Sequence, residues 1–194
     1  MDNNKTVFFI LGALQVILGL SMIFPIIVQI IYDELNGSFI SSGLIAIVIG
    51  ILFILSNLDQ NKKINLQQAF FLTSLSWITI ACFGCLPFIF SNLELTLTDA
   101  FFESMSGITT TGSTIIDDLN NAPKGILFWR AMLQWLGGIG IVVMAITLMP
   151  LMNIGGMQLF KIDSGNTSEK FLPKTKEIAL NIFTIYFFLT ILCA

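Results

Sequence analysis

Long apolar stretches separated by short polar segments dominate this sequence. A helix needs about 20 apolar residues to cross a hydrocarbon core that is about 30 Å thick. Five stretches approach or exceed that length, and Arg130 is the only charged residue within them. They predict membrane-spanning helices, the first kinked at Pro25 and the fourth closed by Pro150: Val7–Ile31, Phe39–Leu55, Phe70–Phe90, Ile126–Met149 and Ile178–Ala194.

The polar connection Ser91–Pro123 has a pattern of its own. It joins two consecutive spans, so both of its ends lie on the same side of the membrane. Within it, "LTDAFFESMSGI" predicts a short helix with Thr98 as N-cap and Asp99 in the first turn. The helical part is about half the length that a span needs. A short apolar helix followed by a polar Thr/Gly run is typical of a re-entrant pore loop.

The Thr/Gly run Thr109–Gly112 follows directly on that helix, whose predicted end is near Gly107. Non-helical backbone at membrane depth is tolerated only where it is buried in protein or lines water. Aligned backbone carbonyls can replace the hydration shell of a cation, and the negative end of the helix dipole favours a cation at the same place. Gly112 can adopt backbone angles that are closed to other residues. The run is a candidate selectivity filter; a turn or a hydroxyl-rich packing surface is the alternative.

Composition makes a bilayer the natural solvent and argues against an enzyme. The chain is 55% hydrophobic and 11% charged, whereas soluble domains carry about 25% charged residues. It has no histidine, which removes the commonest general base and metal ligand. Cys82 and Cys85 form C-x-x-C without a nearby basic residue, so we interpret them as small packing residues. A membrane enzyme with this redox pair, or with Glu103 as general acid–base, is the rival. No cofactor is expected.

The positive charges predict the orientation. With a cytoplasmic N-terminus, seven of the nine Lys and Arg residues lie inside and only Lys124 and Arg130 lie outside, as the positive-inside rule requires. The outer segments would then carry seven acidic residues, which either form an acidic face that concentrates cations or are simply part of solvated loops. The seven residues are Asp33, Glu34, Glu94, Asp99, Glu103, Asp117 and Asp118.

The stretch after the loop, "PKGILFWRAMLQWLGGIGIVVMAITLMP", raises three further expectations. Trp129 and Trp135 suit interfacial positions. Arg130 needs an acidic partner from the outer segment, or else it extends to the interface as a snorkelling side chain. The glycines favour close helix packing over a flexible point: Gly137, Gly138 and Gly140.

Taken together, "DAFFESMSGITTTGSTI" and "PKGILFWRAMLQWLGGIGIVVMAITLMPLMNIGGMQLF" resemble the first pore repeat of the Trk/Ktr/HKT superfamily of potassium transporters, closest to the TrkH type. The resemblance implies an all-α membrane protein with helix–pore loop–helix repeats, four of them around one pore, preceded by two extra helices. It divides the chain into residues 1–65 (the extra pair), 66–160 (the first repeat, with filter strand 109–113), 161–177 (a cytoplasmic linker) and 178–194 (the start of a second repeat). Because the last stretch stops in mid-helix at Ala194, we expect the front part of a longer protein.

The resemblance also implies roles and partners. Thr109, Thr110, Thr111 and Gly112 would form this repeat's quarter of a K+ filter, with Thr110 and Thr111 contacting K+ through backbone oxygen. In plant members of the superfamily, glycine at the position of Gly112 is associated with potassium preference and serine with sodium. A TrkA-like cytosolic nucleotide-binding regulator and a homodimer are implied. The lysine-bearing segments Lys62–Lys63 and Lys161–Lys176 are cytoplasmic in the predicted topology and are candidates to contact that regulator; lysines that only follow the positive-inside rule are the alternative.

The predicted function is therefore potassium uptake across the cytoplasmic (inner) membrane, as the pore-forming subunit of a Trk-type system. Membrane lipid surrounds it and no nucleic-acid partner is expected. The alternative is a non-conducting membrane scaffold or assembly subunit.

Overall fold

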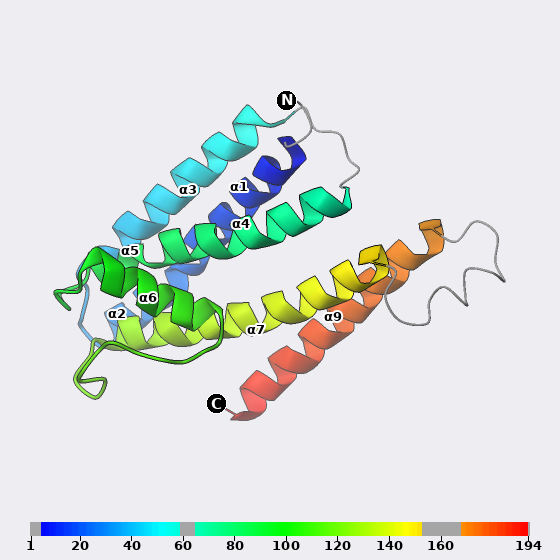
Figure 1. Cartoon of the computed structure of the whole chain (residues 1–194). Coiled ribbons are helices and arrows are strands. Elements are labelled where there is room, and N and C mark those ends of the chain that lie inside the picture. The colour runs from blue at the N-terminus through cyan, green and yellow to red at the C-terminus, as the bar shows by residue number, and fades with distance from the viewer. Residues whose placement is uncertain (1–4, 59–64, 153–167, 194) are drawn as a thin grey trace. The chain divides into compact units, whose positions relative to one another are not determined.

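The structure is a computed structural model that describes residues 5–58, 65–152 and 168–193. Within these residues it is helical and contains no strand. The chain divides into two compact units, Met1–Gly137 and Gly138–Ala194. Figure 1 shows the helices in chain order: α1 (Lys5–Ser21), α2 (Ile23–Ile31), α3 (Ser38–Ser56), α4 (Leu66–Gly84), α5 (Leu86–Ile89), α6 (Leu97–Ile108), α7 (Lys124–Met152) and α9 (Ser168–Cys193).

Four helical stretches among the described residues are long and apolar enough to cross a membrane. They match the first four predicted spans and make this a multi-pass membrane protein: Lys5–Ile31, Ser38–Ser56, Gln67–Ile89 and Lys124–Val142. The apolar part of α9, Ala179–Cys193, is shorter. Helix α7 continues to Met152, so Pro150 does not close it as the sequence predicted.

The first span is interrupted near its proline, as predicted. Helix α1 ends at Ser21 and α2 begins at Ile23. Ser21 lies four residues before Pro25, and a proline ring crowds the carbonyl at that distance. The interruption therefore follows from the sequence.

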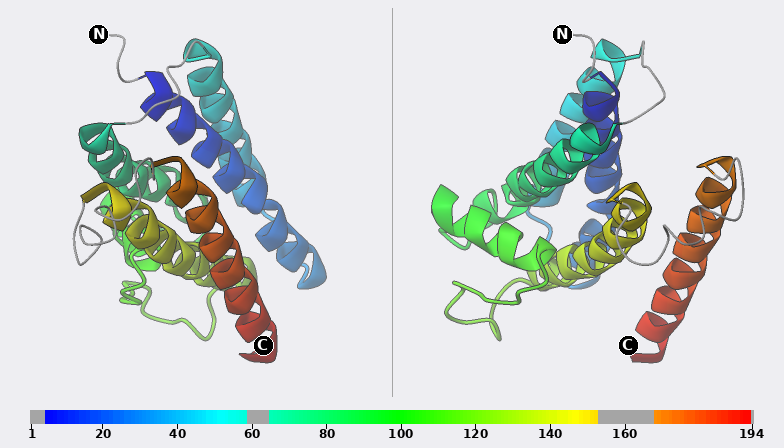
Figure 2. Two further views of the ribbon diagram at one scale, coloured as in Figure 1. Left: turned by 90° about the vertical axis from the view of Figure 1, so that its right-hand side faces the viewer. Right: turned by 45° about the vertical axis from the view of Figure 1, so that its right-hand side comes forward.

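Helices α1 and α3 form a hairpin with very close backbone contact, and they run side by side in both views of Figure 2. A Cβ atom on Gly12 would lie 2.7 Å from the carbonyl oxygen of Gly50, and one on Gly19 would lie 2.9 Å from that of Gly43. Small residues allow such approach between membrane helices. The outward side chains of the hairpin are large and apolar, for example Leu44 and Leu55.

Trp129 is a core residue of the Met1–Gly137 unit. Its side chain is fully buried, its Nε1–H donates to the carbonyl oxygen of Gly84 at 2.9 Å, and its ring meets Phe39 edge-on at 6.0 Å. The indole N–H therefore finds its polar partner inside the protein, and the interfacial depth expected for Trp129 stays a prediction.

The two cysteines of the C-x-x-C pattern differ in environment. Cys85 is buried and Cys82 is exposed, and both are free thiols. The Sγ atom of Cys85 lies 3.0 Å from the carbonyl oxygen of Cys82. Cys85 therefore packs within the helical core, as interpreted from the sequence, whereas Cys82, interpreted in the same way, is exposed.

Candidate functional site

Helix α6 begins with a capping box, a reciprocal pair of side-chain to backbone hydrogen bonds. The Thr96 hydroxyl accepts from the Asp99 N–H at 3.2 Å, and the Asp99 carboxylate accepts from the Thr96 N–H at 3.2 Å. The N-cap is thus Thr96 and not Thr98, because the box needs its acidic residue three positions after the cap. The helix ends at Ile108, one residue later than predicted.

The segment after α6 turns back along the helix (Figure 1). Four consecutive N–H groups donate to carbonyls of the last turn of α6: Thr109 to Met105 at 3.0 Å, Thr110 to Gly107 at 2.9 Å, and Thr111 and Gly112 to Ser106 at 3.1 and 3.4 Å. In the described part of the chain, no carbonyl oxygen of these four residues accepts a hydrogen bond.

Backbone angles in this segment alternate in an unusual way. Thr110 has φ 59° and Gly112 has φ 77°. Glycine adopts such angles readily, whereas a β-branched residue does so at a cost. Strained backbone of this kind clusters at functional sites. The two left-handed residues are the reason that the amides can all point back toward the helix.

Ser106 holds both sides of the turn. Its carbonyl accepts from Thr111 and Gly112, and its hydroxyl donates to the carbonyl oxygen of Ser113 at 2.6 Å. The Ser113 carbonyl is therefore occupied. The run of unoccupied carbonyl oxygens covers Thr109–Gly112, one residue less than the predicted strand 109–113.

Glu103 connects three elements from inside the protein. Its side chain is fully buried. One carboxylate oxygen, Oε2, accepts from the backbone N–H of Ile115 at 3.0 Å, and the other, Oε1, pairs with Nε of Arg130 on α7. Arg130 has the acidic partner that the sequence required, so the snorkelling alternative is wrong. Glu103 belongs to this pair and not to an exposed acidic face.

The sequence carried a signal for this pair. Glu103 is the one charged residue of α6 beyond its first turn, and a charge in the middle of an apolar helix requires a partner. Which residue becomes the partner depends on how α7 packs against α6. The sequence pattern does not give this packing.

Helix α7 approaches the end of α6 and the turn through small residues. A Cβ atom on Gly137 would lie 1.8 Å from the carbonyl oxygen of Ile108, and one on Gly107 would lie 3.1 Å from Cβ of Leu133. Close packing is therefore confirmed at Gly137. In the second unit, a Cβ on Gly138 would lie 2.8 Å from the Tyr186 hydroxyl, whereas one on Gly140 would meet no atom within 4 Å.

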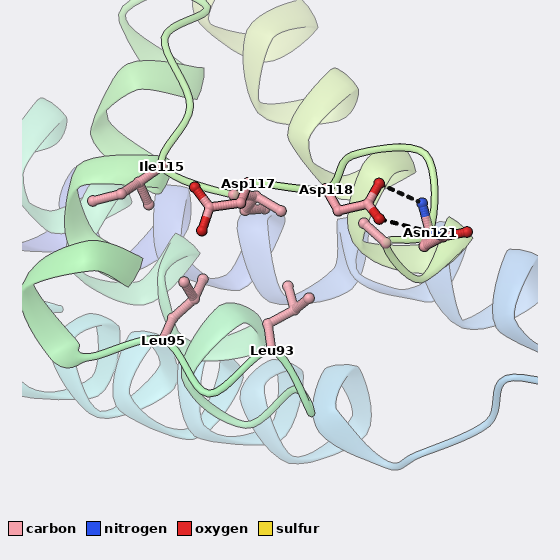
Figure 3. Close-up of a pocket in the computed structure, with 8 residues that line it drawn as sticks. Leu93, Leu95, Ile115, Asp117, Asp118 and Asn121 are labelled. Atoms are coloured by element: carbon pink, nitrogen blue, oxygen red, sulfur yellow. Dashed lines mark hydrogen bonds between the residues drawn. The ribbon is translucent and has the colours of Figure 1, made fainter.

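The loop that follows carries acidic residues beside a shallow apolar hollow of ≈ 330 Å³ (Figure 3). Leu93, Leu95 and Ile115 line the hollow together with Asp117. The Asp118 carboxylate accepts from the Asn121 side-chain amide at 2.7 Å, and this bond holds the pKa of Asp118 below its ordinary value. Glu34, also expected on an acidic face, accepts from the backbone N–H of Lys124 at 2.6 Å.

The polar atoms that this site offers are mainly backbone oxygens. Among the described residues, no three His, Cys, Asp or Glu side chains gather closely enough to hold a metal ion. Carbonyl oxygens at the C-terminal end of a helix favour a cation over an anion.

Comparison with known proteins identifies the family. The model of TrkH, described as a cation transport protein, matches residues 36–194. The chain belongs to the TrkH family. This is a family of transport proteins, in agreement with the prediction that the chain is not an enzyme.

Relatives in this family align over nearly the whole chain. The Trk system potassium uptake protein TrkH of Escherichia coli K12 is 39% identical over 95% of this chain and 39% of its own length. The Trk system potassium uptake protein TrkI of Halomonas elongata is 40% identical over 95% of this chain and 38% of its own length. The chain thus spans about two fifths of the length of these curated relatives.

A solved structure in this family has the same fold. The crystal structure of the potassium transporter TrkH from Vibrio parahaemolyticus superposes with a TM-score of 0.83 and 33% identity, over 96% of this chain and 37% of that chain. The all-α arrangement predicted from the sequence is therefore shown.

Proposed function

We propose that this chain is part of the pore-forming subunit of a potassium uptake system, and that Thr109–Gly112 supply one of four loops of its K+ filter. The observation that carries the proposal is the row of four carbonyl oxygens without a hydrogen-bond partner in the described chain, at the end of a short helix. The names of the TrkH and TrkI relatives support potassium as the ion.

The geometry suits a partly dehydrated cation. Backbone carbonyl oxygens replace water ligands, and non-helical backbone at membrane depth is acceptable where it lines such a path. The C-terminal end of α6 adds the negative end of its dipole at the same place. No covalent chemistry is needed, and the membrane potential supplies about 2.3 kcal/mol per charge per 100 mV.

Residues 110 and 112 carry the specificity in this proposal. Their left-handed backbone directs amides toward α6 and so leaves the carbonyls of Thr109–Gly112 for the ion. A side chain at position 112 would be strained and would lie 3.4 Å from Nε2 of Gln134. Glycine there keeps the strand in the spacing that K+ requires.

The wider assembly is also part of the proposal. One loop is a quarter of a filter, so three similar loops are required to complete it. The N-terminus is cytoplasmic, the membrane is the cytoplasmic (inner) membrane, and a TrkA-like regulator and a homodimer complete the system. Of the six lysines in the two segments assigned to that regulator, three lie outside the described residues (Lys62, Lys63 and Lys161) and three lie in α9 (Lys170, Lys174 and Lys176).

Rubidium uptake tests this function directly. The host is a bacterium without its own potassium importers, and it expresses either this chain or the reading frame extended to its natural stop, each with and without the cytosolic regulator. Uptake from the extended form alone supports one loop among several. Protein in the membrane with no uptake in any combination favours the non-conducting scaffold.

A further inference from the structure

Glu103, on α6, is bonded both to the segment that follows the candidate filter strand and to α7. It is fully buried. Its two carboxylate oxygens have different partners, the backbone N–H of Ile115 and the guanidinium of Arg130. The Glu103 carboxylate therefore links α6, the segment at Ile115 and α7.

The pair contributes little net charge to the site. A buried carboxylate without a partner is strongly destabilising, and Arg130 removes that cost. Because the two charges compensate each other, Glu103 attracts cations much less than an exposed carboxylate such as Asp117 does. Its contribution is therefore to geometry.

The contacts fix the strand at both ends. Glu103 and Ser106 lie three residues apart and so share one face of α6. Ser106 bonds to the Ser113 carbonyl and Glu103 bonds to the Ile115 N–H. At the other end, the amides of Thr109 and Thr110 are tied to the last turn of α6. The unoccupied carbonyls lie between these two anchors.

We propose that Glu103 is the positioning residue of the filter strand: its bond to the Ile115 N–H, braced by Arg130, fixes the spacing of the carbonyl oxygens and so the preference for K+ over Na+. This inference rests on the proposed function. It predicts two requirements for K+ preference that a simple ion pair between Glu103 and Arg130 would not impose. One is the backbone N–H of residue 115, and the other is a hydrogen-bond acceptor at residue 103.

The sharpest test removes the N–H alone. Replacing Ile115 by its α-hydroxy acid in the full reading frame changes that amide to an ester and leaves Glu103, Arg130 and the isoleucine side chain in place. The readout is the ratio of ⁸⁶Rb⁺ to ²²Na⁺ uptake. We expect the ratio to fall about tenfold, the scale of one hydrogen bond to a charged group, with unchanged protein in the membrane.

Side-chain variants separate the positioning role from the ion pair. Glu103→Gln should lower the ratio, because glutamine keeps one acceptor oxygen where the carboxylate has two, and its NH2 group would face another donor, either the Ile115 N–H or the Arg130 guanidinium. The exchanged pair E103R/R130E restores opposite charges but places a donor opposite the Ile115 N–H. We expect this double variant to regain membrane abundance and thermal stability while its uptake ratio stays low. Asp117→Asn, a charge-matched control, should change the uptake of both ions alike.

The outcomes are distinct. A normal uptake ratio in the ester variant overturns the positioning role, and so does a normal ratio in E103R/R130E, since a plain ion pair would then be sufficient. If Glu103→Gln does not accumulate in the membrane, the uptake ratio of the ester variant alone tests the positioning role. Absence of rubidium uptake by the unaltered protein overturns the proposed function itself, and the role of Glu103 with it.

Discussion

The α1–α3 hairpin and the α6–α7 loop region both depend on glycine, but for different reasons. In the hairpin, Gly12 and Gly50 let two helices touch backbone to backbone. In the loop region, Gly137 makes room for a single carbonyl, that of Ile108, at the point where a helix ends. The first is a contact between two complete helices, and the second is a contact with a helix terminus.

This difference explains where the polar side chains are needed. A membrane helix satisfies its own backbone groups, so the hairpin requires shape more than hydrogen bonds. The segment after α6 is not helical, and it needs partners for its amides and for the strand that follows. Ser106 and Glu103 supply those partners. The ion-binding role is therefore expected in the segment after α6, where side chains hold a non-helical backbone in place.

The largest expected effect is at the helix terminus. Gly137→Ala would place a Cβ atom 1.8 Å from the Ile108 carbonyl oxygen, and we expect at least about 3 kcal/mol of destabilisation. The midpoint of thermal unfolding, followed by size-exclusion chromatography in detergent, checks this. Gly140→Ala is the matched control, since its Cβ meets no atom within 4 Å. Equal midpoints for the two variants would contradict the close approach.

The hairpin should respond less and without a change in selectivity. In Gly50→Ala the new Cβ would lie 2.8 Å from the Gly12 carbonyl oxygen, and helices can separate slightly to relieve this, so we expect about 1–3 kcal/mol. The unfolding midpoint should fall while the rubidium-to-sodium uptake ratio stays constant. Leu44→Ala, an exposed position on the same helix, is the control. A changed uptake ratio would show that the hairpin takes part in the filter.

The filter strand should show the opposite behaviour. Gly112→Ser forces a side chain onto a residue with φ 77°, and we expect about a tenfold loss of potassium over sodium discrimination, since strain of about 1–3 kcal/mol is relieved by moving the strand. Thr114→Ser keeps the hydroxyl that bonds the Ile116 N–H and is the control. Unchanged discrimination in Gly112→Ser would mean that Gly112 does not shape the strand.

A smaller effect is expected from the indole hydrogen bond in the core. Trp129→Phe retains an aromatic ring near Phe39 but leaves the Gly84 carbonyl without its donor. The expected cost is about 1 kcal/mol, seen as a modest fall in the unfolding midpoint. An unchanged midpoint would show that the bond contributes nothing net to stability.

The smallest effect concerns the exposed loop. Asn121→Ala removes the side-chain hydrogen bond that is the main cause of the lowered pKa of Asp118, while the backbone bonds remain, so this pKa should rise part of the way toward its ordinary value. A lowered carboxyl pKa stabilises the folded loop at pH values above the ordinary pKa, and this contribution is lost as the pH falls through the folded-state pKa. The variant should therefore show less of this acid-side dependence, which carboxyl NMR titration of Asp118 measures. Rubidium uptake near neutral pH should not change.

The sequence alone determined the membrane helices and the location of the irregular segment. Apolar length, a proline near a helix break and a Thr/Gly run after a short helix are local properties. Such local properties do not depend on contacts with distant parts of the chain. For this reason the spans from Lys5 to Ile31 and from Ser38 to Ser56 were predicted closely. The N-cap is Thr96 and not Thr98, because the capping box places Asp99 three residues after the cap.

Only the tertiary structure decided which polar groups meet. The sequence indicated that Arg130 requires an acidic partner and offered several candidates, and the packing of α7 against α6 selected Glu103. The sequence likewise did not indicate that the Trp129 N–H is held in the core by a carbonyl 45 residues earlier in the chain. Hydropathy reports that a side chain is polar or apolar. The partner of that side chain depends on where distant parts of the chain come together, and that is a property of the folded molecule.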